Sequence, residues 1–445
     1  MQYSNPTLSK SEENSRLIIC KNDKQAWLGE FPRHWKVLRI KNLLCEIDDR
    51  SETGLEELLS VSHYTGVTLK RESLENEDDN LTNAESLIGY KKVEVGDLVI
   101  NIMLAWNGSL GISPYDGITS PAYCVYRCNS GHNPEYFGYL FSTDHFKSEF
   151  RRNSTGIIDS RLRLYSDEFF SIYSVVPPKK EQDEIVSHIK TQSEKINRFI
   201  QKKQRFIELL KERKQSIINH AVTKGIDDNV KMKKSPFGEI PEGWNVRRLK
   251  FLAKKVGDGL HGTPEYVNES DFKFINGNNL INGSIVTDEE TNCVSEAEYL
   301  KYDLKFEDGT ILYSINGTIG NMAIYKNEKV ILGKSAAFIE PDRNKESIIA
   351  SEYLYNFLKS TFAYNYFLDS TASTTIKNLS LFTLRNTPLI FPKSFSEQQK
   401  IITHIKTETK VIDIAITKAE REIELIKEYK EAMIAEMVMR KTKFN

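Results

Sequence analysis

Residues 29–41 read Gly-Glu-Phe-Pro-Arg-His-Trp-Lys-Val-Leu-Arg-Ile-Lys, and residues 238–250 read Gly-Glu-Ile-Pro-Glu-Gly-Trp-Asn-Val-Arg-Arg-Leu-Lys. Gly, Glu, Pro, Trp, Val, Arg and Lys stand in register between the two stretches. A match of this length indicates a duplicated structural unit rather than a chance similarity. Because Trp35 and Trp244 belong to the repeated opening, we expect both indoles to lie in a domain core.

A second pair of matching segments closes each half. Glu181-Gln182 leads to the run His-Ile-Lys-Thr at 188–191, and Glu397-Gln398 leads to the same run at 404–407. Each half therefore begins and ends with the same elements. The 445 residues of the chain suffice for two such halves, since a domain takes about 150 residues.

The closing segments have the seven-residue periodicity of a coiled coil. The two series in the first segment are Val186, Ser193, Ile200, Ile207, Lys214, Ala221 and Ile189, Ile196, Lys203, Leu210, Ile217; those in the second are Ile402, Thr409, Ile416, Ile423, Lys430, Met437 and Ile405, Ile412, Ala419, Ile426, Met433. No Gly or Pro interrupts 181–224 or 397–443, so each helix can reach about 60 Å at ~1.5 Å per residue. Such stripes are too long for one small domain to cover, which predicts that the two helices pair.

The sequence before each helix consists of short apolar runs separated by Gly, Asn, Asp and Ser, which is typical of strands and turns. Gly96-Asp97-Leu98-Val99-Ile100 is answered by Gly309-Thr310-Ile311-Leu312-Tyr313, while the loops between such runs diverge. We therefore predict an α+β fold: two mixed, strand-rich domains and two long helices in an antiparallel coiled coil, related by a pseudo-twofold axis. The expected boundaries are an extension at 1–25, a domain at 26–178, a helix at 179–226, a domain at 227–392 and a helix at 393–445.

The charge of the chain is nearly balanced, with 61 Lys and Arg, 62 Asp and Glu and a net charge of −1. The whole molecule is therefore not a basic polyanion binder, and any nucleic-acid surface must be local. The five cysteines form no CxxC pair and indicate neither a disulfide framework nor a zinc site. No apolar run approaches the roughly 20 residues of a membrane span and no signal-peptide pattern opens the chain, so we expect a cytoplasmic protein.

Catalytic motifs are missing from the sequence. It contains neither the catalytic (N/D)PP(Y/F) tetrapeptide of a DNA methyltransferase nor a GxxxxGK(S/T) phosphate loop. Asp258, Asp271 and Lys273 could in principle hold Mg²⁺ as in a nuclease, but short charged patterns of this kind arise freely by chance. A coiled-coil adaptor that binds no DNA is the other alternative. We predict no catalytic residues and no bound metal.

The repeated Gly-Glu-x-Pro-x-x-Trp opening, the Gly-Asp-Leu-Val strand with its Asn-Gly turn, and the Pro-Pro-Lys-Lys-Glu-Gln-Asp-Glu-Ile entry to a long helix resemble the specificity subunits of type I restriction-modification systems. The likeness extends from Trp27 to Lys443. In that family each half holds a target recognition domain followed by a conserved helix, and the helices form an antiparallel coiled coil.

The resemblance implies a non-catalytic subunit that binds an asymmetric bipartite site in double-stranded DNA. Modification (methyltransferase) subunits would dock on it, and ATP-dependent restriction subunits would join them. S-adenosylmethionine, ATP and Mg would then be bound by those partners, with no cofactor on this chain.

The DNA-binding residues are expected in polar loops of both domains, because Arg suits guanine, Asn suits adenine, and Lys, Ser and Thr contact phosphates. For any one of them, an ordinary solvated loop residue is about as good an interpretation. The candidates are Ser62, His63, Tyr64, Lys70, Arg71, Asn107, Ser109, Arg151, Arg152, Arg161 and Arg163 in the first domain, and His261, Thr263, Asn278, Asn279, Asn316, Lys334, Thr374, Thr375 and Lys377 in the second.

Overall fold

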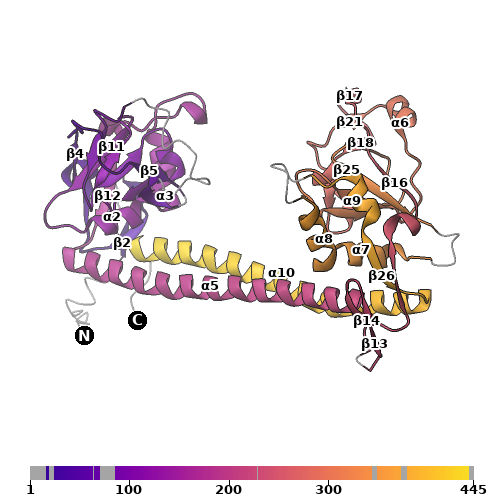
Figure 1. Ribbon diagram of the computed structural model, residues 1–445. Coiled ribbons are helices and arrows are strands. Elements are labelled where there is room, and N and C mark those ends of the chain that lie inside the picture. Colours follow the sequence, from indigo (N-terminus) through magenta and orange to yellow (C-terminus); the bar gives the residue numbers. More distant parts are fainter. Residues whose placement is uncertain are drawn as a thin grey trace, which may run out of the picture. The chain divides into compact units, whose positions relative to one another are not determined.

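The structure is a computed structural model that describes residues 17–19, 25–63, 65–70, 86–227, 229–342, 348–371 and 378–439. The chain forms two compact units: unit 1 comprises Met1–Lys202 and Glu422–Asn445, and unit 2 comprises Lys203–Arg421. Each unit contains one globular domain and a stretch of both long helices, α5 (Lys179–Thr223) and α10 (Phe395–Met439). In each unit the α10 stretch runs alongside the α5 stretch (Figure 1).

The domain of unit 1 is built on an antiparallel sheet of order β4-β11-β8-β9, in which Val125 of the second strand lies between Ile47 and Val99. Strand β12 pairs with β3, and β1 pairs with β2. The described strands are β1 (Leu17–Ile19), β2 (Glu30–Pro32), β3 (Lys36–Arg39), β4 (Leu44–Ile47), β5 (Leu59–Ser62), β6 (Gly66–Leu69), β7 (Lys91–Val93), β8 (Leu98–Asn101), β9 (Leu110–Ile112), β10 (Gly117–Thr119), β11 (Tyr123–Cys128) and β12 (Tyr173–Val176), and the helices are η1 (Ala26–Leu28), η2 (Ile40–Asn42), η4 (Ala105–Asn107), α2 (Pro134–Phe141), α3 (Asp144–Asn153), η5 (Asp159–Arg161) and α4 (Ser166–Ser171).

The domain of unit 2 repeats this frame. Its sheet of order β16-β25-β22-β23 is again antiparallel, β26 pairs with β15, and β13 pairs with β14. A second sheet, β17-β21-β18-β24, contains one parallel pair. The described strands are β13 (Met232–Ser235), β14 (Gly238–Pro241), β15 (Trp244–Arg248), β16 (Ala253–Asp258), β17 (Tyr266–Val267), β18 (Phe272–Ile275), β19 (Leu280–Ile281), β20 (Ser284–Ile285), β21 (Cys293–Val294), β22 (Ile311–Ser314), β23 (Met322–Ile324), β24 (Val330–Leu332), β25 (Ala336–Pro341) and β26 (Pro388–Pro392), and the helices are η6 (Leu249–Phe251), η7 (Gly277–Asn279), α6 (Glu296–Tyr302), α7 (Ser351–Leu358), α8 (Thr361–Thr371) and α9 (Leu381–Asn386).

The central strands are continuously apolar because both faces of the sheet are covered. Leu98 and Ile100 of β8 pack among the aromatic side chains of α2 and α3, whereas Val99 packs against β5 and β6. In β22, Ile311 and Leu312 likewise face two different clusters. The glycines of the repeated turns are required by their backbone conformation. Gly108 and Gly317 adopt φ of +87° and +75°, where a residue with a side chain would be strained.

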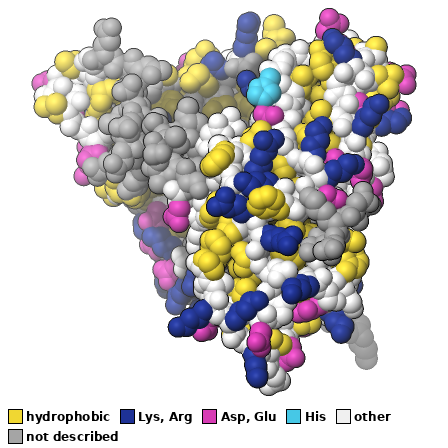
Figure 2. Space-filling model, turned by 45° about the vertical axis from the view of Figure 1, so that its right-hand side comes forward, with side chains coloured by type: hydrophobic (Ala, Val, Ile, Leu, Met, Phe, Trp, Pro, Cys, Tyr) yellow, Lys and Arg dark blue, Asp and Glu magenta, His cyan; other side chains and the backbone are white. Residues whose placement is uncertain are grey.

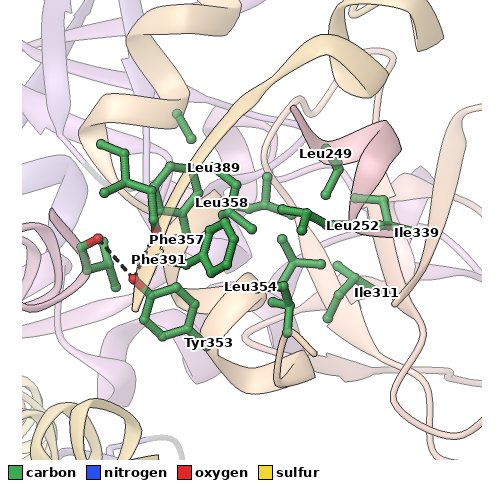
Figure 3. Packing of buried hydrophobic residues seen from close by; sticks show 14 of the residues in the cluster. Leu249, Leu252, Ile311, Ile339, Tyr353, Leu354, Phe357, Leu358, Leu389 and Phe391 are labelled. Carbon is green, nitrogen blue, oxygen red and sulfur yellow. Dashed lines mark hydrogen bonds between the residues drawn. The ribbon is translucent and has the colours of Figure 1, made fainter. Parts of the chain in front are cut away.

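The core of unit 2 joins the sheet to α7 and to the repeated opening of the domain. Leu354, Phe357 and Leu358 of α7 pack with Leu249 and with strands β22, β25 and β26 (Figure 3). Trp244 belongs to this cluster, and Trp35 belongs to the corresponding core of unit 1. The expectation that both indoles are core residues is confirmed.

The coiled-coil seam predicted from the heptads is confirmed within each unit. Every described position of the four series is buried or half-buried, while most neighbouring positions of α5 and α10 are exposed. Lys430 donates to Asn197 in unit 1 (3.1 Å), and Lys214 pairs with Asp413 in unit 2 (2.6 Å). Positions thus rise along α5 as they fall along α10, which is the register of an antiparallel pair. Among the helices of the described residues, none combines the length and apolar character needed to cross a membrane.

Candidate nucleic-acid interface

The Glu-Gln pair at the start of each long helix fastens that helix to its domain. In unit 1 the Trp35 indole N–H donates to Glu181 at 3.0 Å, and in unit 2 the Trp244 indole N–H donates to Glu397 at 2.8 Å. His34 also contacts the Glu181 carboxylate, at 2.6 Å. The repeated Trp and Glu of the sequence therefore form the same contact twice.

Gln182 and Gln398, which follow these glutamates, are fully buried. Their side-chain amides hydrogen-bond to backbone N–H and carbonyl groups of the domain. Gln182 donates to the Pro177 carbonyl at 2.8 Å and accepts from the Asn133 N–H at 2.7 Å. Gln398 donates to the Pro392 carbonyl at 3.2 Å and accepts from the Ala350 N–H at 2.8 Å. A buried polar group is costly unless it is hydrogen-bonded, so these glutamines fix the entry angle of each helix.

A tyrosine in each domain reaches the end of the other long helix. The Tyr136 hydroxyl donates to the Val438 carbonyl at 2.9 Å in unit 1, and the Tyr353 hydroxyl contacts the Val222 and Ile390 carbonyls at 3.1 and 3.0 Å in unit 2 (Figure 3). Burial raises the pKa of both phenols well above its usual range. Each domain is thus held by the beginning of one helix and the end of the other.

In unit 1, the β8–β9 turn contacts the end of α3 and the loop at 154–163. The Arg151 guanidinium lies 5.2 Å from the ring centroid of Trp106, and the Leu164 N–H donates to the Ile102 carbonyl at 3.0 Å. A Cβ at position 108 would lie 2.8 Å from the Lys147 side chain, so α3 closely covers the turn. These segments form one surface, which we call the unit 1 loop surface: Trp106, Asn107, Lys147, Arg151, Arg152 and 154–163.

Four predicted residues are exposed on the unit 1 loop surface: Asn107, Arg151, Arg152 and Arg161. Arg151 pairs with Asp159 at 2.7 Å and Arg152 with Glu149 at 2.9 Å. The Arg151–Asp159 pair is exposed on both sides and contributes little to stability, so the Arg151 guanidinium can exchange partners at small cost. The partner of Arg152 is different, because the Glu149 carboxylate is buried.

The remaining candidates of unit 1 have other surroundings. Ser109 is only 1% exposed and belongs to the interior of the turn, so its hydroxyl is not offered to a ligand at the surface. Arg163 is half-buried and donates to the Leu162 carbonyl at 2.8 Å. Ser62 and His63 lie at the tip of the β5–β6 hairpin, while Lys70 follows β6. Tyr64 and Arg71 lie outside the described residues.

In unit 2 a polar network links the η7 turn, the β22–β23 turn and the β24–β25 turn. The Thr318 hydroxyl donates to the Asn278 side chain at 3.2 Å, and the Ser335 hydroxyl donates to the Asn276 side chain at 3.0 Å. Asn316 and Lys334 are exposed beside these contacts. Asn316 forms an isolated antiparallel bridge with Asn378, which lies between α8 and α9. We call this set the unit 2 loop surface: Asn276, Asn278, Asn316, Thr318, Lys334 and Ser335.

Asn279 serves its own turn, because its side chain accepts from the Asn276 N–H at 2.9 Å and donates to the Val286 carbonyl at 3.1 Å. His261 and Thr263 are exposed after β16, and His261 lies 2.7 Å from Asp258. Thr374, Thr375 and Lys377 lie outside the described residues. Lys and Arg side chains are spread over the face turned forward in Figure 2 rather than gathered in one block, as expected for a nearly neutral chain with local contacts.

Sequence reasoning did not select Asn276, Thr318 or Lys147. Asn276 comes directly after the apolar strand β18, and a polar residue at a strand end is a signal that could have identified it. Lys147 belongs to α3, and only the fold brings it against Gly108.

The three residues of the nuclease alternative are not assembled into a metal site. Asp258 lies on β16 beside His261, whereas Lys273 lies on β18, in a different sheet, and donates to the Cys293 sulfur at 3.0 Å. A pocket of about 480 Å³ is lined by Glu269, Ser270, Asp271, Lys273, Ile285, Thr287, Glu328, Lys329 and Val330. It includes Asp271 but not Asp258. Among the described residues, no group of three or more His, Cys, Asp or Glu side chains could hold a metal ion.

Comparisons with known proteins find similarity to type I restriction enzyme specificity subunits. Residues 241–425 match the model of the type I restriction modification DNA specificity domain. The type I restriction enzyme MjaVIII specificity subunit of Methanocaldococcus jannaschii is 25% identical over 298 residues, which is 65% of each protein. The MjaIX specificity subunit of the same organism is 30% identical over 176 residues, 38% of this chain and 39% of the relative. The matches thus span less than two thirds of the length of these two relatives.

The fold agrees with a solved relative. A chain in a structure of a type I R-M system superposes with a TM-score of 0.64 at 14% sequence identity, over 92% of this chain and 98% of the other. The fold expected from the sequence is therefore shared along most of the chain. Residues 241–425 therefore match a type I restriction modification DNA specificity domain, and the chain as a whole is similar in sequence and fold to type I restriction enzyme specificity subunits.

Proposed function

We propose that this chain is the non-catalytic DNA specificity subunit of a type I restriction-modification complex, and that it binds an asymmetric bipartite site in duplex DNA. One observation carries the proposal: the two domains share a sheet order and the same Trp–Glu and Gln contacts, yet their equivalent turns present different side chains. A shared frame with divergent turns is what two readers of different sequences require.

The chemistry of the two loop surfaces fits different half-sites. Unit 1 exposes Arg151, Arg152 and Arg161, whose guanidiniums suit guanine or phosphate. Unit 2 exposes Asn278 and Asn316, whose amides suit adenine, with Lys334 available to a phosphate. Each loop surface includes a turn of the central sheet of its domain, so the side chains proposed to contact bases are positioned by rigid elements.

The long helices would set the spacing between the half-sites. α5 and α10 each continue from one unit into the other without an interruption. A fixed connection requires a fixed number of base pairs, because an added base pair both displaces and rotates a half-site. Two modest readers joined in this way also gain affinity through effective concentration.

Modification subunits are proposed to dock on the outer side of the helices. In unit 2, Val411 and Ile414 of α10 and Leu209 of α5 are exposed at heptad positions turned away from the seam. Exposed apolar side chains at such spacing suit further amphipathic helices. Ile414→Glu should reduce copurification with modification subunits, while Thr417→Glu, which adds the same charge at an exposed neighbouring position, should not.

The partners would supply the chemistry in the compartment that holds the DNA, the cytoplasm. S-adenosylmethionine is assigned to the modification subunits, and ATP and Mg to the restriction subunits that join them. This chain would bind none of these groups.

Selection of bound duplexes from a randomised pool tests the proposal, using the full chain with modification subunits. The expected product is two specified segments separated by an unspecified spacer of constant length. Arg161→Ala should relax preference in one segment and Asn316→Ala in the other, each at a cost of about 1–3 kcal/mol. Arg198→Ala, which removes an exposed charge from α5, should leave both segments unchanged. A single contiguous site, or no selected sequence with partner assembly intact, would refute the proposal.

A further inference from the structure

The loop at 154–163 has a defined shape. Thr155 and Arg163 exchange two backbone hydrogen bonds of 2.9 Å, which close the loop at its base. Gly156 adopts φ of +143°, and a Cβ there would lie 2.5 Å from the Arg161 carbonyl oxygen. Leu162 and Leu164, which follow η5, are buried and anchor the end of the loop in the interior. The two residues between the glycine and η5 therefore form a supported tip.

That tip consists of two isoleucines in solvent. Ile157 is 100% exposed and Ile158 is 53% exposed. A single exposed aliphatic side chain is ordinary on a protein surface. Here two adjacent β-branched residues are presented by a closed turn, and burial of each would be favourable by roughly 25 cal/mol per Å² of apolar surface.

The surroundings of the tip are cationic. Between 151 and 163 the sequence has four arginines and one aspartate, and Arg151, Arg152 and Arg161 are exposed. Arg151 is ordered by Trp106 beneath it and by Asp159 beside it. An apolar tip within a group of guanidiniums matches duplex DNA, in which phosphates lie outside and stacked apolar bases lie within.

We propose that Ile157 and Ile158 form a wedge that inserts between adjacent base pairs of the half-site read by unit 1, while Arg151 and Arg152 hold the flanking phosphates. The inference rests on the proposed function and deepens it. Insertion would unstack one base step, so part of the sequence preference would come from how easily that step opens. Flexible pyrimidine–purine steps would be favoured there.

The test uses the full chain without modification subunits, so that no partner disturbs the bases, and a duplex of the selected sequence with 2-aminopurine placed at successive positions. Fluorescence of this base rises when it loses stacking. We expect a rise at one step with the wild-type chain. The double variant Ile157→Ser with Ile158→Ser should lose that rise and bind about tenfold more weakly, given the apolar area withdrawn.

Leu55→Ser is the matched control, because Leu55 is 88% exposed in the same unit but lies outside the arginine cluster. It should retain both the fluorescence rise and the affinity. A rise that persists in the isoleucine double variant, or no rise at any position with the wild-type chain bound, would overturn the wedge and leave the proposed function standing. Failure to select any DNA sequence would instead overturn the proposed function, and the wedge with it.

Discussion

Single buried side chains connect each domain to its helix, and Gln398 provides the sharpest test of this at the residue scale. Replacing it by alanine leaves the Ala350 N–H and the Pro392 carbonyl without their partner. Since each unsatisfied buried group costs about 1–3 kcal/mol, we expect Gln398→Ala to lower the free energy of unfolding by about 2–4 kcal/mol. Chemical denaturation measures this loss.

The neighbouring glutamine provides the control for this measurement. Gln399 is exposed on the same turn of α10, so Gln399→Ala should change the free energy of unfolding by no more than about 0.5 kcal/mol. Equal effects of the two substitutions would contradict the role assigned to Gln398.

His132 makes the junction of unit 1 sensitive to pH. Burial, followed by the nearby Lys179 and Lys36, lowers the pKa of its imidazole, whose ring lies 3.2 Å from the Gln182 side-chain nitrogen. The unfolded chain therefore takes up this proton more readily than the folded chain. The stabilisation that neutral His132 contributes is fully present above the unfolded pKa near 6.5. It is lost as pH falls from that value toward the folded pKa.

Thermal unfolding at pH 7.5 and at pH 5.5 compares the wild type with His132→Gln. The melting temperature of the variant should fall less between pH 7.5 and pH 5.5 than that of the wild type. Carboxylates titrate in both proteins, whereas the His132 imidazole titrates only in the wild type. In unit 2 the equivalent Gln398 hydrogen-bonds, among the described residues, to backbone groups of Ile348, Ala350 and Pro392. An identical pH response of wild type and variant would refute the contribution of His132.

At the scale of elements, heptads predicted the helices and their seam well, because burial of one stripe repeats with the sequence itself. The repeat also revealed the Trp and Glu residues before any contact was known. It could not reveal that Gln182 and Gln398 are buried, since glutamine is ordinarily a surface residue and only the fold brings carbonyls to it. Likewise, Lys214 and Lys430 break the apolar series, yet each finds a polar partner on the facing helix.

Shortening both helices tests their proposed role as a spacer. Extending the register of the Asn197–Lys430 and Lys214–Asp413 contacts matches residues 202–208 of α5 with 419–425 of α10, so deleting both stretches preserves the heptads. The deletion removes about 10 Å of helix, equivalent to about three base pairs at ~3.4 Å each. Selection from randomised duplexes should then yield a spacer about three base pairs shorter, or binding to the original site should be lost.

Deletion of 202–208 alone is the companion variant. It places seven residues of α10 out of register and should disrupt the seam, which circular dichroism on heating would report. If the paired deletion selects the original spacer, the helices do not set the distance.

At the scale of the whole molecule, the duplicated frame was predictable from sequence, whereas the composition of the loop surfaces was predictable only in part. Asn316 and Arg151 were both selected as polar loop residues; Asn316 lies in the β22–β23 turn, whereas Arg151 lies near the end of α3. The Asn-Gly-Ser pattern at 107–109 marks a turn but does not tell whether the serine hydroxyl faces inward. Ser109 was therefore a misleading candidate, because its side chain is buried and the residue is 1% exposed. Contacts such as Arg151 with Trp106 join segments far apart in sequence, which local patterns cannot show.

We propose that this chain alone determines which DNA sequence its complex modifies. Mapping methylated bases across the genome of cells with and without the gene tests that claim most directly. We predict an asymmetric motif of two specified segments with a constant spacer, which disappears on deletion of the gene and returns with the intact chain. A methylation pattern that is unchanged by the deletion, or the loss of a motif with only one contiguous segment, would contradict it.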